Sequence, residues 1–72
     1  MEKIYKYKTA LGIFYIAVIS GRFHPVFDDE SLGSYVTPQQ AVDDLAGGHT
    51  FSPGFDTEGL GIPAELSEWE QM

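Results

Sequence analysis

Residues 32–48 read LGSYVTPQQAVDDLAGG, and this stretch predicts a strand end, a helix start, a short helix and a double-glycine stop. The Thr37 hydroxyl can cap the helix, and Pro38 suits the first helical position because that amide needs no partner. Gln40 stands at the third helical position, from which its side chain can reach back to the Thr37 amide and complete a capping box. The stretch therefore predicts where a helix begins.

The predicted helix covers residues 38–46 and is amphipathic. Ala41, Val42 and Leu45 follow at helical spacing and form one apolar stripe. Gly47 and Gly48 come next, and either can supply the left-handed residue that closes a helix. This pattern indicates structure strongly and carries little information about function.

Length and composition favour one small domain, residues 1–72. The 72 residues lie near the lower size at which a single core is self-sufficient. The chain has no cysteine, which excludes disulfides and thiolate metal or redox sites. A hydrophobic fraction of 43% argues against disorder, and five Phe, four Tyr and one Trp are expected to supply much of the core.

The first half of the chain predicts strands. Residues 3–9 alternate tyrosines with lysines, which is typical of a half-buried strand at a sheet edge. Residues 13–19, IFYIAVI, are apolar on both faces and predict the most buried strand. A third strand is expected over 22–27, where Pro25 predicts a bulge or an unpaired position.

A polar loop over 28–31 and a fourth strand over 32–36 complete the predicted sheet. The short connections favour an α+β fold: a four-stranded antiparallel meander over 3–36, with the helix on one face and an ordered aromatic tail over 49–72. We expect a short helical turn within 62–69. The apolar tail residues are expected either to cover the second face of the sheet or to extend the helix-side core: Phe51, Phe55, Leu60, Ile62, Leu66 and Trp69.

The apolar run over 9–20, behind three lysines, has the look of a secretion signal. It is too short to span a bilayer, which needs about 20 apolar residues, and its removal would leave little core. We therefore interpret it as a strand, and not as a secretion signal or a membrane span.

Charge is divided unevenly along the chain. The first 22 residues hold all four Lys and Arg and one acid, whereas the remaining 50 hold ten acids, giving a net charge of −7. Such an acidic chain disfavours non-specific binding to nucleic acid or anionic membranes and favours a partner with a basic surface.

The candidate partner-binding residues are five acids: Asp28, Asp29 and Glu30 in the predicted loop, and Asp43 and Asp44 late in the helix. The helix dipole disfavours the negative charges of Asp43 and Asp44 by about 0.3–1 kcal/mol each. A basic partner would be a reason to keep them there, and a solvated helix face is the alternative. We expect the two groups to form one acidic patch.

No catalytic, cofactor or metal site is predicted. The acidic loop lacks the spaced oxygen ligands and the glycine of a calcium loop, and nothing in the spacing of His24 and His49 demands zinc. The sequence contains no phosphate-cradling glycine loop and no nucleophile elbow. We therefore do not expect an enzyme.

Residues 21–41 resemble the strand–strand–helix core of AP2-type DNA-binding domains. GRF at 21–23 matches a Gly-Arg-aromatic strand, LGSYVT at 32–37 matches a Leu-Gly-x-aromatic-x-Thr strand end, and Ala41 falls where that family has an Ala-rich helix. The family's sheet is rich in Arg, whereas only Arg22 remains here. The resemblance therefore implies a shared topology and not DNA binding.

A second resemblance covers most of the chain. LGSY at 32–35, DDLAGGHTFSP at 43–53, LGIP at 60–63 and LSEWE at 66–70 are similar to motifs of a group of short bacterial proteins without a known activity. This resemblance implies only a small bacterial, cytoplasmic protein.

Together these observations predict a small acidic, non-enzymatic module that binds another protein. A more specific version of this prediction is a phage- or defence-related inhibitor that mimics the charge of nucleic acid. The alternative is nucleic-acid binding through the sheet face, using the four cations Lys3, Lys6, Lys8 and Arg22. The two-sided apolar strand also predicts a symmetric homodimer, with the basic N-terminal strand of one copy facing the acidic surface of the other.

Overall fold

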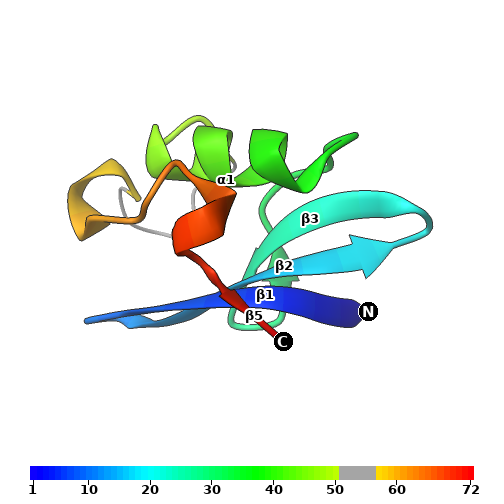
Figure 1. The fold of residues 1–72 in the computed structure, drawn as a ribbon, viewed down its shortest axis with the longest axis horizontal. Coiled ribbons are helices and arrows are strands. Elements are labelled where there is room, and N and C mark those ends of the chain that lie inside the picture. Colours follow the sequence, from blue (N-terminus) through cyan, green and yellow to red (C-terminus); the bar gives the residue numbers. More distant parts are fainter. Residues whose placement is uncertain (51–56) are drawn as a thin grey trace.

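The computed structural model describes residues 1–50 and 57–72, and within them the chain is an antiparallel sheet with one α-helix (Figure 1). The strand order in the sheet is β4-β3-β2-β1-β5. The strands are β1 (Glu2–Thr9), β2 (Gly12–Ile19), β3 (Arg22–Phe27), β4 (Glu30–Ser31) and β5 (Glu70–Gln71). The α+β fold is confirmed, but the sheet has five strands rather than four.

The first two hairpins follow the prediction closely. The residues Ala10 and Leu11 join β1 to β2, and Ser20 and Gly21 join β2 to β3. Ser20 and Gly21 have φ values of 52° and 77°, and two positive φ values in a two-residue loop match the twist of the flanking strands. Short loops of this kind fix the register of the three long strands.

The prediction of a bulge or unpaired position at Pro25 is wrong. Pro25 pairs in regular register with Ile16 of β2, and its carbonyl accepts a hydrogen bond from the Leu32 amide at 2.8 Å. The N–H and C=O of one strand residue point to the same side, so the missing proline N–H faces the sheet edge and costs no bond to β2. The register shift lies instead in β1, between Lys3 and Tyr5.

The predicted fourth strand over 32–36 is also wrong. β4 is Glu30–Ser31, and Tyr35 forms only an isolated bridge to Phe23. The chain reverses within two residues because Asp28 and Asp29 both adopt positive φ, at 54° and 61°, so Glu30 already pairs with Phe27.

β5 was not predicted, and it changes the place of β1 in the sheet. Tyr5 pairs with Gln71 and Lys6 with Glu70, while the Met72 amide donates to the Ile4 carbonyl at 3.0 Å. β1 is therefore not an edge strand along this part of its length. A strand of two residues has no periodicity that a sequence pattern would reveal.

The helix α1 (Pro38–Ala46) has the predicted bounds, and its predicted cap is present. The Thr37 hydroxyl accepts a hydrogen bond from the Gln40 amide at 3.1 Å, and Pro38 occupies the first helical turn. Within the described residues the Gln40 side chain makes no return bond to the Thr37 amide, so the capping box is only half formed.

The double glycine ends α1 in a Schellman motif. Gly48 takes the left-handed conformation with φ of 75°. The His49 amide donates to the Asp44 carbonyl at 2.8 Å and the Gly48 amide to the Leu45 carbonyl at 3.2 Å. These are the two bonds that define the motif, and they satisfy carbonyls that the helix end would otherwise leave free.

The C-terminal segment packs on the same face of the sheet as α1 (Figure 1). It contains two short 3₁₀ turns, Glu58–Leu60 and Leu66–Glu68, the second of which falls within the predicted helical turn. Ile62 and Trp69 join the buried cluster that also contains Phe14 of β2. The segment thus extends the helix-side core; Phe51 and Phe55 lie outside the described residues.

Specific hydrogen bonds fasten this segment to α1. The Gln39 side chain donates to the Ala64 carbonyl at 2.6 Å and accepts from the Leu66 amide at 3.1 Å. The buried Thr57 hydroxyl donates to the Leu45 carbonyl at 2.8 Å. The position of the tail is therefore set by named polar contacts as well as by apolar packing.

The other face of the sheet, which we call the outer face, is covered mainly by its own side chains. The register places Lys3, Lys6 and Lys8 on this face, opposite Ala17, Tyr15 and Ile13 of β2. Ala17 is fully buried although no described helix or tail segment lies over it. A polar outer face of this kind is common in antiparallel sheets, and it explains how β2 can be apolar on both sides without a second layer.

Candidate partner-binding site

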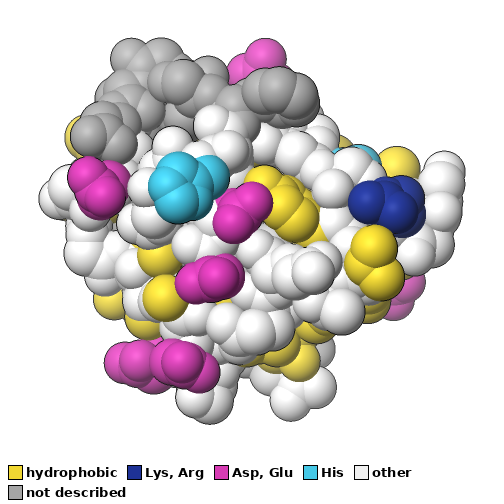
Figure 2. Space-filling model, turned by 90° about the horizontal axis from the view of Figure 1, so that it is seen from above, with side chains coloured by type: hydrophobic (Ala, Val, Ile, Leu, Met, Phe, Trp, Pro, Cys, Tyr) yellow, Lys and Arg dark blue, Asp and Glu magenta, His cyan; other side chains and the backbone are white. Residues whose placement is uncertain are grey.

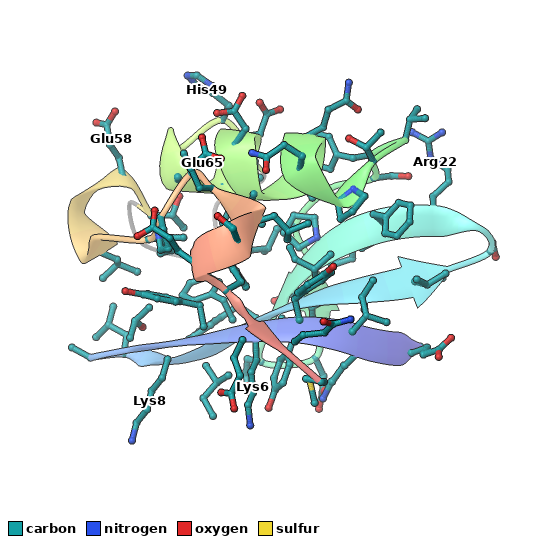
Figure 3. The ribbon with its side chains drawn as sticks, viewed as in Figure 1. Lys6, Lys8, Arg22, His49, Glu58 and Glu65 are labelled. Carbon is teal, nitrogen blue, oxygen red and sulfur yellow. The ribbon has the colours of Figure 1, made fainter. Side chains whose placement is uncertain are left out.

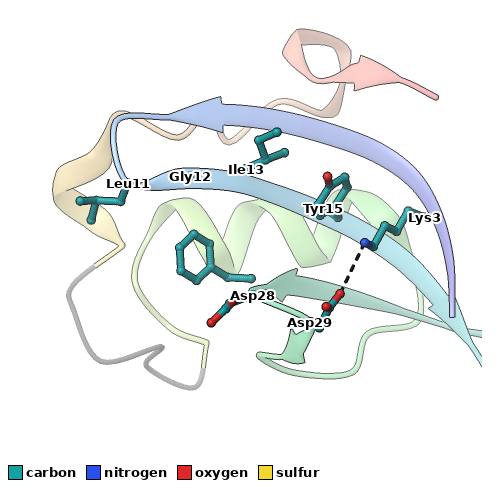
Figure 4. Close-up of a pocket in the computed structure, with 8 residues that line it drawn as sticks. Lys3, Leu11, Gly12, Ile13, Tyr15, Asp28 and Asp29 are labelled. Atoms are coloured by element: carbon teal, nitrogen blue, oxygen red, sulfur yellow. Dashed lines mark ion pairs between the residues drawn. The ribbon is translucent and has the colours of Figure 1, made fainter.

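A hollow of about 560 Å³ opens on the outer face, and we call it the outer-face hollow (Figure 4). Its charged residues are Lys3 from β1 and Asp28 and Asp29 from the turn between β3 and β4. Its aromatic walls are Tyr15 and Phe27. The first three strands thus bring together side chains that are far apart in the sequence.

Backbone conformation places the two aspartates at this hollow. Asp28 and Asp29 both have positive φ, a region that short polar side chains tolerate better than most others. The Asp29 carboxylate lies 3.5 Å from the Lys3 ammonium and its side chain is 84% exposed (Figure 4). Within the described residues Asp28 makes neither an ion pair nor a side-chain hydrogen bond. One carboxylate in the hollow is therefore uncompensated.

The Lys3 ammonium also lies over an aromatic ring. Its Nζ atom is 4.3 Å from the centroid of the Tyr15 ring, which is cation–π geometry. A positive charge in the outer-face hollow is thus held between a ring face and a carboxylate. The arrangement favours cations over neutral or anionic groups.

Apolar groups complete the outer-face hollow. Leu11 and Ile13 line it and are 54% and 37% exposed, which is unusual for large aliphatic side chains in this chain. Gly12 stands between them with φ of 140°, and a Cβ there would lie 3.1 Å from the Phe27 ring. The Phe27 ring in turn packs on the buried Phe14 ring, with 4.6 Å between centroids. The Phe27 side of the hollow therefore packs directly on the hydrophobic core.

The other two candidate acids lie on α1, on the opposite side of the sheet. Asp43 is exposed, whereas Asp44 is half-buried and lies close to Tyr35. Burial raises the pKa of Tyr35 to about 12, and the hydrogen-bonding capacity and negative charge of Asp44 act in the same direction. The structure does not bring Asp43 and Asp44 together with the turn at Asp28 and Asp29.

Charge is divided between the two sides of the molecule. Asp and Glu side chains gather on the helix side (Figure 2). His49, Glu58 and Glu65 lie on that side, whereas Lys6 and Lys8 point away from it (Figure 3). Arg22 lies on the helix side, so the four Lys and Arg residues do not share one surface.

Arg22 lies on the helix side and is used within the molecule. Its guanidinium donates to the Ser34 hydroxyl at 2.5 Å and to the Ser34 carbonyl at 3.2 Å. On the outer face, the Lys6 ammonium is 3.8 Å from the Glu70 carboxylate. Two of the cations assigned to a nucleic-acid surface, Lys3 and Lys6, thus have acidic neighbours there.

The histidines do not assemble a metal site. The His24 Nδ1 atom is 2.8 Å from the Ser31 hydroxyl oxygen, and His49 lies exposed after the helix. Among the residues that the structure describes, no group of three His, Asp or Glu is placed to hold a metal ion. In the same part of the chain, no helix has the length and apolarity needed to cross a membrane.

Sequence reasoning identified the acidic turn but missed the hollow beside it. Tyr15 and Ile13 were assigned to the core because β2 is apolar on both faces. Strict alternation along β1 would place Lys3 with Tyr5 and Tyr7, on the face opposite Tyr15. Only the register shift between Lys3 and Tyr5 brings Lys3 to the face of Tyr15, and no sequence pattern indicated that shift. No family model, curated protein or solved structure matches the chain, so comparison with known proteins assigns no role to these residues.

Proposed function

We propose that this chain is a non-enzymatic protein-interaction module, and that the outer-face hollow with its acidic turn receives a partner with a basic surface. The proposal rests on one observation: two aspartates, aromatic rings and exposed aliphatic side chains line the same hollow of about 560 Å³. Protein interfaces commonly combine an apolar centre with a polar rim.

The net charge of −7 supports the same kind of partner. An excess of negative charge steers a basic surface toward the chain, and the uncompensated Asp28 carboxylate gives the encounter a local target. Asp44 takes no part in this proposal because it is half-buried close to Tyr35, on the helix side of the sheet. Asp43, exposed on α1, serves as a comparison site.

Binding of fluorescein-labelled poly-L-lysine, followed by fluorescence anisotropy at low salt, tests the proposal. The double variant Asp28→Asn/Asp29→Asn removes two charges at the hollow, and asparagine still tolerates positive φ. The matched control Asp43→Asn/Glu65→Gln removes two exposed charges on the helix side. We expect the first variant to weaken binding about tenfold more than the second.

Equal losses in the two variants would show that total charge alone drives binding, and would contradict a partner site at the hollow. Circular dichroism of both variants should match that of the parent chain. This control separates lost binding from lost folding.

Nucleic-acid binding through the sheet remains the alternative, because Lys3, Lys6 and Lys8 share the outer face. Against it, Lys3 and Lys6 have acidic neighbours and Arg22 lies on the other side. We expect the chain to pass through a heparin column at low salt. Retention that falls steeply as salt rises would favour the alternative.

A separate form of the interaction module would use the helix side in place of the outer-face hollow: a phage- or defence-related inhibitor, active in the bacterial cytoplasm, that presents carboxylates in place of phosphates. The acids gathered on the helix side support this form (Figure 2). It predicts that the chain competes with duplex DNA for a basic nucleic-acid-binding protein.

A further inference from the structure

We propose that the outer-face hollow binds the guanidinium of one arginine side chain of the partner, in place of the Lys3 ammonium. This inference rests on the proposed function and names the group that the site would recognise. In the structure the Lys3 ammonium of the chain itself occupies this position, beside Tyr15 and Asp29.

Lys3 shows which ligand chemistry the hollow accepts. Its ammonium is 4.3 Å from the Tyr15 ring centroid and 3.5 Å from the Asp29 carboxylate, so a ring face and a carboxylate reach the same cation. Asp28 adds a second negative charge without an ion pair among the described residues. With one lysine and two aspartates, the hollow keeps a net charge of −1 while Lys3 occupies it.

The hollow is larger than the Lys3 head group requires. A volume of about 560 Å³ falls within the range of about 300–1,000 Å³ that small-molecule sites occupy. Leu11 and Ile13 are exposed on its wall, where the alkyl stem of an incoming side chain would lie. A long cationic side chain therefore fits both the apolar and the acidic parts.

Lys3 is held weakly enough to be displaced. Its side chain is 33% exposed and that of Asp29 is 84% exposed, and ion pairs at such sites contribute little. A guanidinium forms two parallel bonds to a carboxylate and stacks flat on an aromatic ring, which an ammonium does not do. Arginine is therefore favoured over lysine as the incoming group.

Titration of the ¹⁵N-labelled chain with N-acetylarginine amide, followed by NMR, tests this inference directly. We expect saturable shifts of the Gly12, Tyr15, Asp28 and Asp29 amides. N-acetylcitrulline amide has nearly the same shape without the charge and should give no shifts there. Asp28→Asn should weaken arginine binding about two- to fivefold, as expected for loss of one exposed charge partner.

Lys3→Met and Lys8→Met form a matched pair, because both remove one positive charge from β1 and only Lys3 lines the hollow. Loss of the internal competitor in Lys3→Met should strengthen arginine binding about two- to fivefold, whereas Lys8→Met should leave it unchanged. Equal effects of the two variants, shifts confined to α1, or equal binding of citrulline would each overturn the arginine site.

The result also separates this inference from the proposed function. Poly-L-lysine binding that depends on Asp28 and Asp29, without arginine shifts at the hollow, overturns the arginine site alone. If poly-L-lysine binding is also independent of these aspartates, both proposals fail. Concentration-dependent shifts at the hollow without ligand would place a second copy there and would likewise overturn the arginine site.

Discussion

Asp44 shows that one carboxylate can have a structural use that its sequence position hides. Near the end of a short helix it faces an unfavourable dipole, which suggested a role in binding. The structure instead places it close to Tyr35, whose ring passes so near Gly33 that a Cβ there would be 2.9 Å away. Asp44 thus acts on a neighbouring side chain, because its charge helps to raise the pKa of the Tyr35 hydroxyl.

The raised pKa of Tyr35 predicts a pH dependence of stability. The pKa of Tyr35 is raised to about 12, above the value of about 10 for an unfolded chain, so the folded state holds the proton more tightly. The stabilising contribution is fully present below pH about 10 and is lost as pH rises through about 12. The difference in unfolding free energy between the parent and Tyr35→Phe should therefore shrink between about pH 9 and about pH 11.5 in urea titrations. A difference that stays constant would show that folding does not raise the pKa of Tyr35.

The turn at Asp29 predicts a conflict between stability and binding. With φ of 61°, Asp29 occupies a region that costs an L-residue roughly 1 kcal/mol and glycine almost nothing. Asp29→Gly should raise the unfolding free energy by up to about 1 kcal/mol, less what the exposed pair with Lys3 contributes. Chemical denaturation measures the gain, and poly-L-lysine binding should fall in the same variant. Asp43→Gly, within a helix, should instead destabilise the chain.

At the scale of elements, local signals predicted the long elements and missed the short ones. Thr37, Pro38 and the glycines marked α1, and alternation marked the first three strands. β4 and β5 have two residues each and depend on tertiary pairing, so no local pattern reveals them. The outer-face hollow was missed for a related reason, because its walls meet only after β1, β2 and β3 are placed in register.

The helix start offers a direct test of a predicted cap. Thr37→Ala removes the hydroxyl that accepts the Gln40 amide bond and should cost about 1 kcal/mol. In a domain this small the thermal midpoint should fall by about 4–8 °C, which circular dichroism will show. Thr37→Ser keeps the hydroxyl and should retain most of the stability. An unchanged midpoint in the alanine variant would mean that the bond contributes nothing.

The tail predicts a spectroscopic signature. Trp69 is 5% exposed and its indole N–H donates to the Pro63 carbonyl at 3.1 Å. Its fluorescence should therefore be blue-shifted relative to that of indole in water. Deleting residues 60–72 removes Trp69 and β5, and should expose apolar surface that binds the dye ANS. Water-like emission from the intact chain would show that the tail does not pack on the sheet.

At the scale of the molecule, the sheet divides a polar outer face from an acidic helix side. The homodimer expected from the sequence relied on apolar side chains on both faces of β2. Ala17 on the outer face is already fully buried within one copy, as is Val26, which pairs with Tyr15. A second copy would therefore cover less apolar surface than the sequence suggested.

We accordingly expect a monomer in which the outer-face hollow is open. Light scattering at tens of micromolar, at low and at high salt, should give the mass of one chain in both conditions. A dimer that dissociates as salt rises would support the charge-paired assembly predicted from the sequence. A dimer insensitive to salt would indicate apolar contact between outer faces instead.

The bond between Met72 and Ile4 has a consequence for the order in which the chain folds. It closes a loop that contains nearly all of the sequence, and contacts of such long separation form slowly because the intervening chain must first be ordered. The three long strands and α1 depend on nearer neighbours and can assemble earlier. During synthesis β1 leaves the ribosome before β5, so its pairing with β5 must wait until that strand has been made. Until then the backbone N–H and C=O groups on one side of β1 stay available for pairing with other strands. A chaperone would bind the unfinished chain at this side of β1.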